Sequence, residues 1–65
     1  MQKETRHERE IRRVAQLLRL IWHDGTPADE RENARNRLAV WRKAWGEVEY
    51  RQTQHAAIAL LIKQA

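Results

Sequence analysis

The chain has 65 residues, no cysteine and a formal net charge of +4, with 13 Lys and Arg against 9 Asp and Glu. This length limits residues 1–65 to a single domain with a thin core, because a domain so small buries only about 60% of the surface that its unfolded chain exposes. Without cysteine, and with three scattered histidines, disulfides and metal sites offer no extra stability. The composition therefore favours self-association, most simply as a homodimer.

The sequence also lacks the usual signals for membrane insertion and export. No apolar run reaches the roughly 18 residues that span a bilayer, and the first residues contain no signal-peptide core. The absence of cysteine fits a reducing compartment. We therefore expect a cytoplasmic protein with no membrane partner.

The first predicted element is an amphipathic helix over about residues 3–23. Its apolar residues recur three and four positions apart, which places them on one face of a helix. No apolar residue anchors the chain before about Glu8, so we expect residues 1–7 to fray. The apolar stripe comprises Ile11, Val14, Leu18 and Ile21.

Residues 24–27, Asp-Gly-Thr-Pro, predict the position of a turn. Gly25 can adopt the left-handed conformation with which many helices end. Thr26 can then cap a second helix, with Pro27 at its first helical position. Because the connection is so short, the two helices should run antiparallel as a helical hairpin.

The second predicted helix is longer and covers about residues 27–64. Its residues Leu38, Trp41, Trp45 and Val48 follow heptad-like spacing and should form a seam that faces the first helix. Gly46 lies within this pattern without changing its phase, which favours a continuous helix despite the cost of about 1 kcal/mol for a helical glycine. The first helix would then cover its partner only to about residue 47.

One alternative arrangement is a monomeric three-helix bundle. It requires the second helix to break between Gly46 and Gln54, so that a third helix folds back. Residues 47–54 contain no further glycine or proline, which favours the hairpin over the bundle.

The most apolar part of the chain is residues 56–62, seven consecutive apolar residues. On a helix they would point to two sides, and the short first helix could not cover them. A patch of this kind is typical of an interaction site. We therefore expect a dimer or partner interface that comprises His55, Ile58, Leu60, Leu61 and Ile62, with Trp22 exposed near the turn.

A second candidate surface is basic. Arg31, Arg35 and Arg42 fall close together on one side of the second helix, and Lys43 could extend the strip. Arginine binds phosphate in a bidentate manner, so this strip is a possible contact for DNA or RNA. Interleaved acidic residues dilute its field, which also fits an ordinary solvated helix face.

Catalytic chemistry has little support in the sequence. Serine and cysteine are absent, so the common hydrolytic nucleophiles are missing. The segment that begins at His7 lacks the second histidine of a zinc-protease helix, because position 11 is isoleucine. We expect no enzyme, no cofactor, no metal and no small-molecule substrate.

Two functional hypotheses follow from these surfaces. The first is a small non-enzymatic regulator or adaptor, of the phage or plasmid inhibitor type, that self-associates and binds a protein partner through the apolar end of the second helix. The second is a basic helical module that binds DNA or RNA through the arginine strip. Binding to nucleic acid that weakens steeply with salt would distinguish the second from the first.

Overall fold

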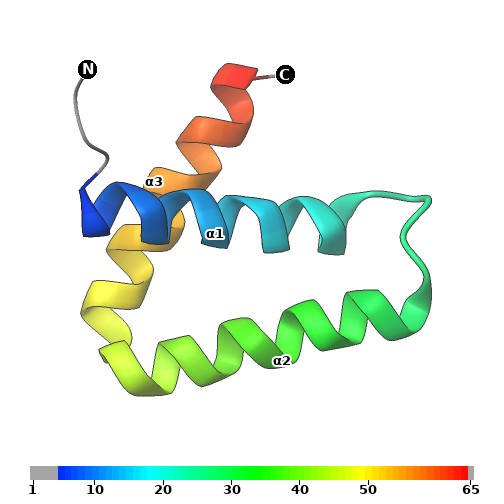
Figure 1. Cartoon of the computed structure of the whole chain (residues 1–65), viewed down its shortest axis with the longest axis horizontal. Helices are drawn as coiled ribbons and strands as arrows, with labels where there is room; N and C mark the ends of the chain where they lie inside the picture. Colours follow the sequence, from blue (N-terminus) through cyan, green and yellow to red (C-terminus); the bar gives the residue numbers. More distant parts are fainter. Residues whose placement is uncertain (1–4, 65) are drawn as a thin grey trace.

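The computed structural model describes residues 5–64, and within that range all regular secondary structure is helical. Its three helices are α1 (Arg6–Trp22), α2 (Ala28–Trp45) and α3 (Glu47–Gln64). Figure 1 shows α1 and α2 running in opposite directions, while α3 crosses α1 steeply. The all-α prediction is confirmed, and the number of helices is that of the three-helix alternative.

The start of α1 is set by Thr5. Its side-chain hydroxyl oxygen accepts a hydrogen bond from the backbone N–H of Glu8 at 3.1 Å, which satisfies one of the free donors at the helix N-terminus. Of residues 1–7, for which we predicted fraying, Arg6 and His7 are helical. The first four residues lie outside the described part of the chain.

Gly25 does not adopt the left-handed conformation that we predicted for the turn. Its φ is not positive, and α1 ends instead at His23, whose N–H bonds the carbonyl of Arg19. The N–H of Gly25 donates to Nδ1 of His23 at 3.0 Å. A Cβ at position 25 would lie 3.1 Å from the His23 ring. Glycine is therefore favoured here by close approach to the imidazole and not by a left-handed backbone.

The predicted Thr26 cap of α2 is also wrong by one residue. Pro27 occupies the N-cap position with ψ of 150°, and no side chain caps the helix. This extended ψ delays the first helical residue to Ala28. The loop carbonyls of His23 and Thr26 instead accept hydrogen bonds from the guanidinium of Arg31, at 3.0 and 3.4 Å.

The prediction of one uninterrupted helix over residues 27–64 is wrong because the chain breaks at Gly46. This residue has φ of 88° and ψ of 156°, a combination that is essentially restricted to glycine. One such residue is enough to change the chain direction, so the absence of a further glycine or proline in residues 47–54 does not prevent the break. Arg42 and Glu47 form an ion pair across the break.

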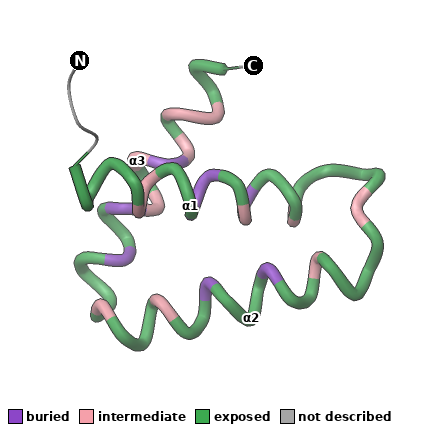
Figure 2. Tube along the Cα trace, viewed as in Figure 1, coloured by how far each residue is buried: buried purple, intermediate pink, exposed green. Residues whose placement is uncertain are grey.

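The core lies where α1 meets both other helices (Figure 2). Of the predicted apolar stripe and seam, Val14, Leu18 and Leu38 are buried. Four further residues of the stripe and seam are half-buried against this core, namely Ile11, Ile21, Trp41 and Trp45. Val48 does not belong to the seam, because the break at Gly46 redirects α3 and leaves its side chain 72% exposed.

Candidate functional site

The apolar segment of α3 is partly covered within the chain. Ala57 is fully buried, and Ile58, Leu60 and Leu61 are half-buried against the core. Only Ile62 among the predicted apolar interface residues of α3 is strongly exposed, at 71%. The expectation that this segment has no intramolecular cover is wrong, because α3 turns at Gly46 and packs chiefly on α1.

The structure separates the other two residues of the predicted interface. Trp22 is 56% exposed and lines a hollow of about 300 Å³ together with Leu61, between the ends of α1 and α3. His55 is exposed in the middle of α3, in a depression that it shares with Val48. These residues therefore do not form one continuous surface.

The predicted basic strip is partly occupied by contacts within the protein. Arg31 is half-buried and binds the loop carbonyls between α1 and α2. Arg42 donates a hydrogen bond to Glu47, and this contact raises the pKa of Arg42 and lowers the pKa of Glu47. Arg35 and Lys43 are exposed. Two of the four cations thus already have partners that a phosphate would have to displace.

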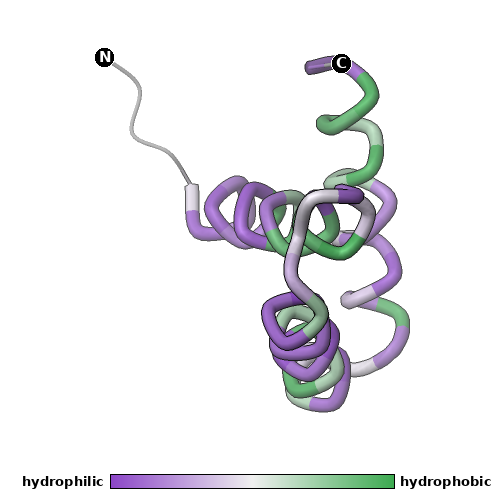
Figure 3. Tube along the Cα trace, turned by 90° about the vertical axis from the view of Figure 1, so that its right-hand side faces the viewer, coloured by the Kyte–Doolittle hydropathy of each residue, from purple (hydrophilic) through white to green (hydrophobic). Residues whose placement is uncertain are grey.

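A larger surface lies between α1 and α2, on the side away from α3. Figure 3, turned by 90°, shows α3 on one side of the layer that α1 and α2 form. The opposite side holds a groove of about 590 Å³. Leu17 and Leu20 line it from α1, and Ala34, Val40 and Trp41 line it from α2. We call this feature the α1–α2 groove.

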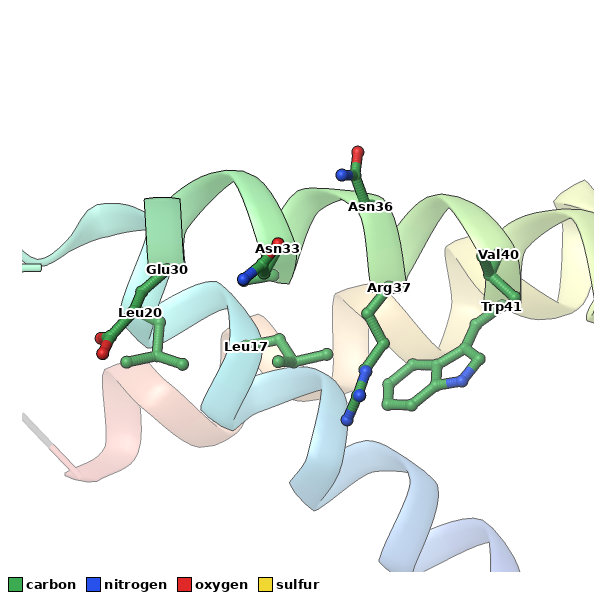
Figure 4. A pocket seen from close by; sticks show the side chains of 9 residues that line it. Leu17, Leu20, Glu30, Asn33, Asn36, Arg37, Val40 and Trp41 are labelled. Atoms are coloured by element: carbon green, nitrogen blue, oxygen red, sulfur yellow. The ribbon is translucent and has the colours of Figure 1, made fainter. Parts of the chain in front are cut away.

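Figure 4 shows how the side chains of the groove are arranged. Arg37 and Trp41 reach from α2 toward α1, where Leu17 and Leu20 lie. Leu20 is 40% exposed and Val40 is 63% exposed. The walls therefore offer partly exposed apolar side chains, above all those of Leu20 and Val40.

Polar residues of α2 accompany this apolar lining. They are Glu30, Asn33, Asn36 and Arg37, of which Asn36 points away from the groove in Figure 4. Glu30 and Arg37 carry opposite charges and are two helical turns apart, about 10 Å along the axis. The groove thus combines an apolar centre with one acidic and one basic group in a fixed order.

Sequence reasoning missed the α1–α2 groove. Leu20 and Val40 lie outside both predicted apolar stripes, and such apolar residues on an otherwise polar helix face were the available signal. A single exposed leucine or valine is common in folded proteins. Only the packing of α1 on α2 brings the two side chains to one surface.

Two further features concern the described residues as a whole, namely metal-binding groups and helices that could span a membrane. Among residues 5–64, no group of three His, Cys, Asp or Glu side chains could hold a metal ion. The three described helices are also too short or too polar to cross a membrane. What the groove offers is apolar area flanked by Glu30 and Arg37.

Comparison with known proteins adds no assignment. No protein-family model, no curated protein and no solved structure matched the chain.

Proposed function

We propose that this protein is a non-enzymatic adaptor or regulator that binds an amphipathic helix of a partner protein along the α1–α2 groove. The class of function is the one expected from the sequence, whereas the site differs, because α3 is partly covered by α1. The observation that carries the proposal is the apolar groove on the side of α1 and α2 that α3 leaves open.

The accessible surface area of the molecule is larger than that of a compact protein of the same mass, which supports the proposal of an unfilled binding site. The chain exposes 5536 Å², whereas a compact protein of this mass exposes about 4,400 Å². The five undescribed residues account for at most about 850 Å², even with the full surface of an unfolded chain. The remaining surface of about 4,700 Å² still exceeds, by about 550 Å², the roughly 4,100 Å² expected for a compact protein with the mass of residues 5–64. A typical protein interface buries about 800 Å² on each partner.

A helix is the occupant that fits this groove best. Two neighbouring antiparallel helices present a furrow into which the side-chain ridge of a third helix packs. Such a helix needs an apolar stripe opposite Leu17, Leu20 and Val40. For charge complementarity, the partner helix should place a basic residue opposite Glu30 and an acidic residue, two turns away, opposite Arg37.

Photo-crosslinking at two exposed valines tests the proposal. Benzoylphenylalanine replaces Val40 in the groove or, as the matched control, Val48 on α3, which is similarly exposed. Irradiation in the cells from which the sequence comes should link position 40, but not position 48, to an amphipathic helix of one protein. The additional substitution Leu20→Glu should abolish that link without unfolding the chain, because Leu20 is already 40% exposed.

Several outcomes would overturn the proposal. They are identical cross-linked proteins from both positions, cross-links only to nucleic acid, and cross-links only to other copies of the chain. The nucleic-acid hypothesis has less support than the groove, because Arg31 and Arg42 are held by protein groups.

A further inference from the structure

Gly46 is all that separates α2 and α3 from a single helix. Its N–H donates to the carbonyl of Arg42 at 3.1 Å, and its carbonyl accepts from the N–H of Tyr50 at 3.0 Å. Both are the bonds, four residues apart, that an uninterrupted helix makes at this position. Rotation about the backbone bonds of Gly46 is therefore enough to join the two helices.

The joined helix has local interactions in its favour. It would add the three backbone hydrogen bonds that run from residues 47–49 to residues 43–45. Lys43 and Glu47 would become an i,i+4 pair, which replaces the present pair of Arg42 and Glu47. Val48, now 72% exposed, would lie on the same helix face as Trp41 and Trp45, as the predicted seam requires. No atom lies within 4 Å of a Cβ placed on Gly46, so a side chain at this position meets no obstruction.

Joining α2 and α3 has a cost, because it would remove α3 from α1, which now buries part of it. Tyr50, Thr53 and Ala57 are buried on α3, and α3 packs chiefly on α1. A joined helix of about 55 Å would carry these residues away from their own α1. In the joined form, these residues can be buried in the same way only by α1 of a second copy of the chain.

We infer that two copies of this chain exchange α3. In the exchanged dimer Gly46 is helical, and the α3 of each copy packs on the α1 of the other with the contacts that it makes in the monomer. Such exchange is a low-cost route to a dimer, because it re-forms the contacts between α1 and α3 and requires no new surface. The α1–α2 groove is not used, so this inference stands independently of the proposed function.

Substitution at position 46 with the two mirror forms of alanine tests the inference. Chemical synthesis of the 65-residue chain allows Gly46→Ala and the replacement of Gly46 by D-alanine. L-Alanine disfavours the positive φ of the monomer and favours a helix, whereas D-alanine accepts a positive φ. Light scattering during size-exclusion chromatography should show that Gly46→Ala lowers the dimer dissociation constant about tenfold or more. The D-alanine chain should remain monomeric at the same concentrations.

A cross-link distinguishes exchange from any other dimer. Arg19 and Gln64 line the same two hollows between α1 and α3, and the chain has no native cysteine. One chain with Arg19→Cys is mixed with another with Gln64→Cys, both also carrying Gly46→Ala, and a bismaleimide is added. Exchange predicts a covalent heterodimer, and both cysteines in one D-alanine chain should instead be linked within that chain.

Three results would overturn the inference. They are a Gly46→Ala chain that stays monomeric, a dimer of the two single-cysteine chains that gives no covalent heterodimer, and a loss of helical circular dichroism on Gly46→Ala. The last would show that the substitution unfolds the break and does not extend the helix.

Discussion

Trp45 and Tyr50 lie on opposite sides of Gly46 with ring centroids 6.3 Å apart and ring planes tilted by 37°. Trp45 also stacks on Trp41, with centroids 5.4 Å apart and planes 16° from parallel. The three rings join the end of α2 to the start of α3. Aromatic pairs of this geometry stabilise a fold beyond the area that they bury, so this cluster helps to fix the direction of α3.

Tyr50→Ala should lower the free energy of unfolding by about 3 to 5 kcal/mol, the range for loss of a buried aromatic side chain. Tyr50 is only 7% exposed, and the substitution also removes its contact with Trp45. Tyr50→Phe is the matched control, because it keeps the ring. Urea unfolding followed by circular dichroism measures both, and a midpoint for Tyr50→Ala equal to that of the unmodified protein would contradict the aromatic cluster.

Leu38→Ala should cost about 2 to 5 kcal/mol, because Leu38 is 6% exposed and belongs to the core. Arg35, three residues earlier on α2, is exposed. Arg35→Ala should therefore change the stability by no more than about 0.5 kcal/mol. Thermal unfolding separates the two variants, and equal melting temperatures would show that the seam is not buried.

Stability should depend on pH through Glu47. Its hydrogen bond and charge interaction with Arg42, with a smaller contribution from Arg51, lower the pKa of Glu47 below 4.5. Because the pKa is lower in the folded state, ionised Glu47 stabilises the fold above about pH 4.5, and this contribution is lost as the pH falls through the folded pKa. Urea midpoints at pH 6 and pH 3 should therefore differ more for the unmodified protein than for Glu47→Gln.

Repeating the pH experiment at high ionic strength is the control. Arg42 and Glu47 are both exposed, with side-chain accessibilities of 56% and 57%, so salt should screen their attraction. In 1 M NaCl, with a Debye length of about 3 Å, the difference between the two chains should shrink. An identical pH dependence for both chains at low salt would exclude Glu47 as its source.

Binding to nucleic acid should be weak and non-specific. With Arg31 and Arg42 engaged in protein contacts, few free cations remain on the predicted strip. We expect dissociation constants no tighter than about 1 μM for a labelled DNA or RNA duplex at physiological salt. Fluorescence anisotropy at two salt concentrations measures this, with Arg35→Ala as the variant. Tight binding that Arg35→Ala abolishes would favour the nucleic-acid hypothesis instead.

The apolar pattern alone was sufficient to predict several local features. Residues three and four apart identified α1 and its buried positions Val14 and Leu18, as well as Leu38 on α2. Helix spacing is a local property, so it can be recognised without knowledge of the neighbours. The exposure of Trp22, one residue away from the stripe of α1, followed from the same geometry.

The candidate site was not predictable in this way. Leu20 belongs to α1 and Val40 to α2, twenty positions apart, and neither side chain departs from what a polar helix face commonly carries. They form a groove only because α1 and α2 pack together and α3 takes the opposite side. That arrangement depends on contacts between segments that are distant in sequence.

Periodicity and turn residues are local features, so they were enough to predict the helices, the position of the first turn and the inward-facing residues of α1. The path of α3, in contrast, depends on packing between segments that are distant in sequence. Gly46 tolerates both a helical and a positive φ, so its local preference leaves the break undecided. The packing of Tyr50, Thr53 and Ala57 favours the positive φ, because burial of these side chains offsets the helical bonds that the break interrupts.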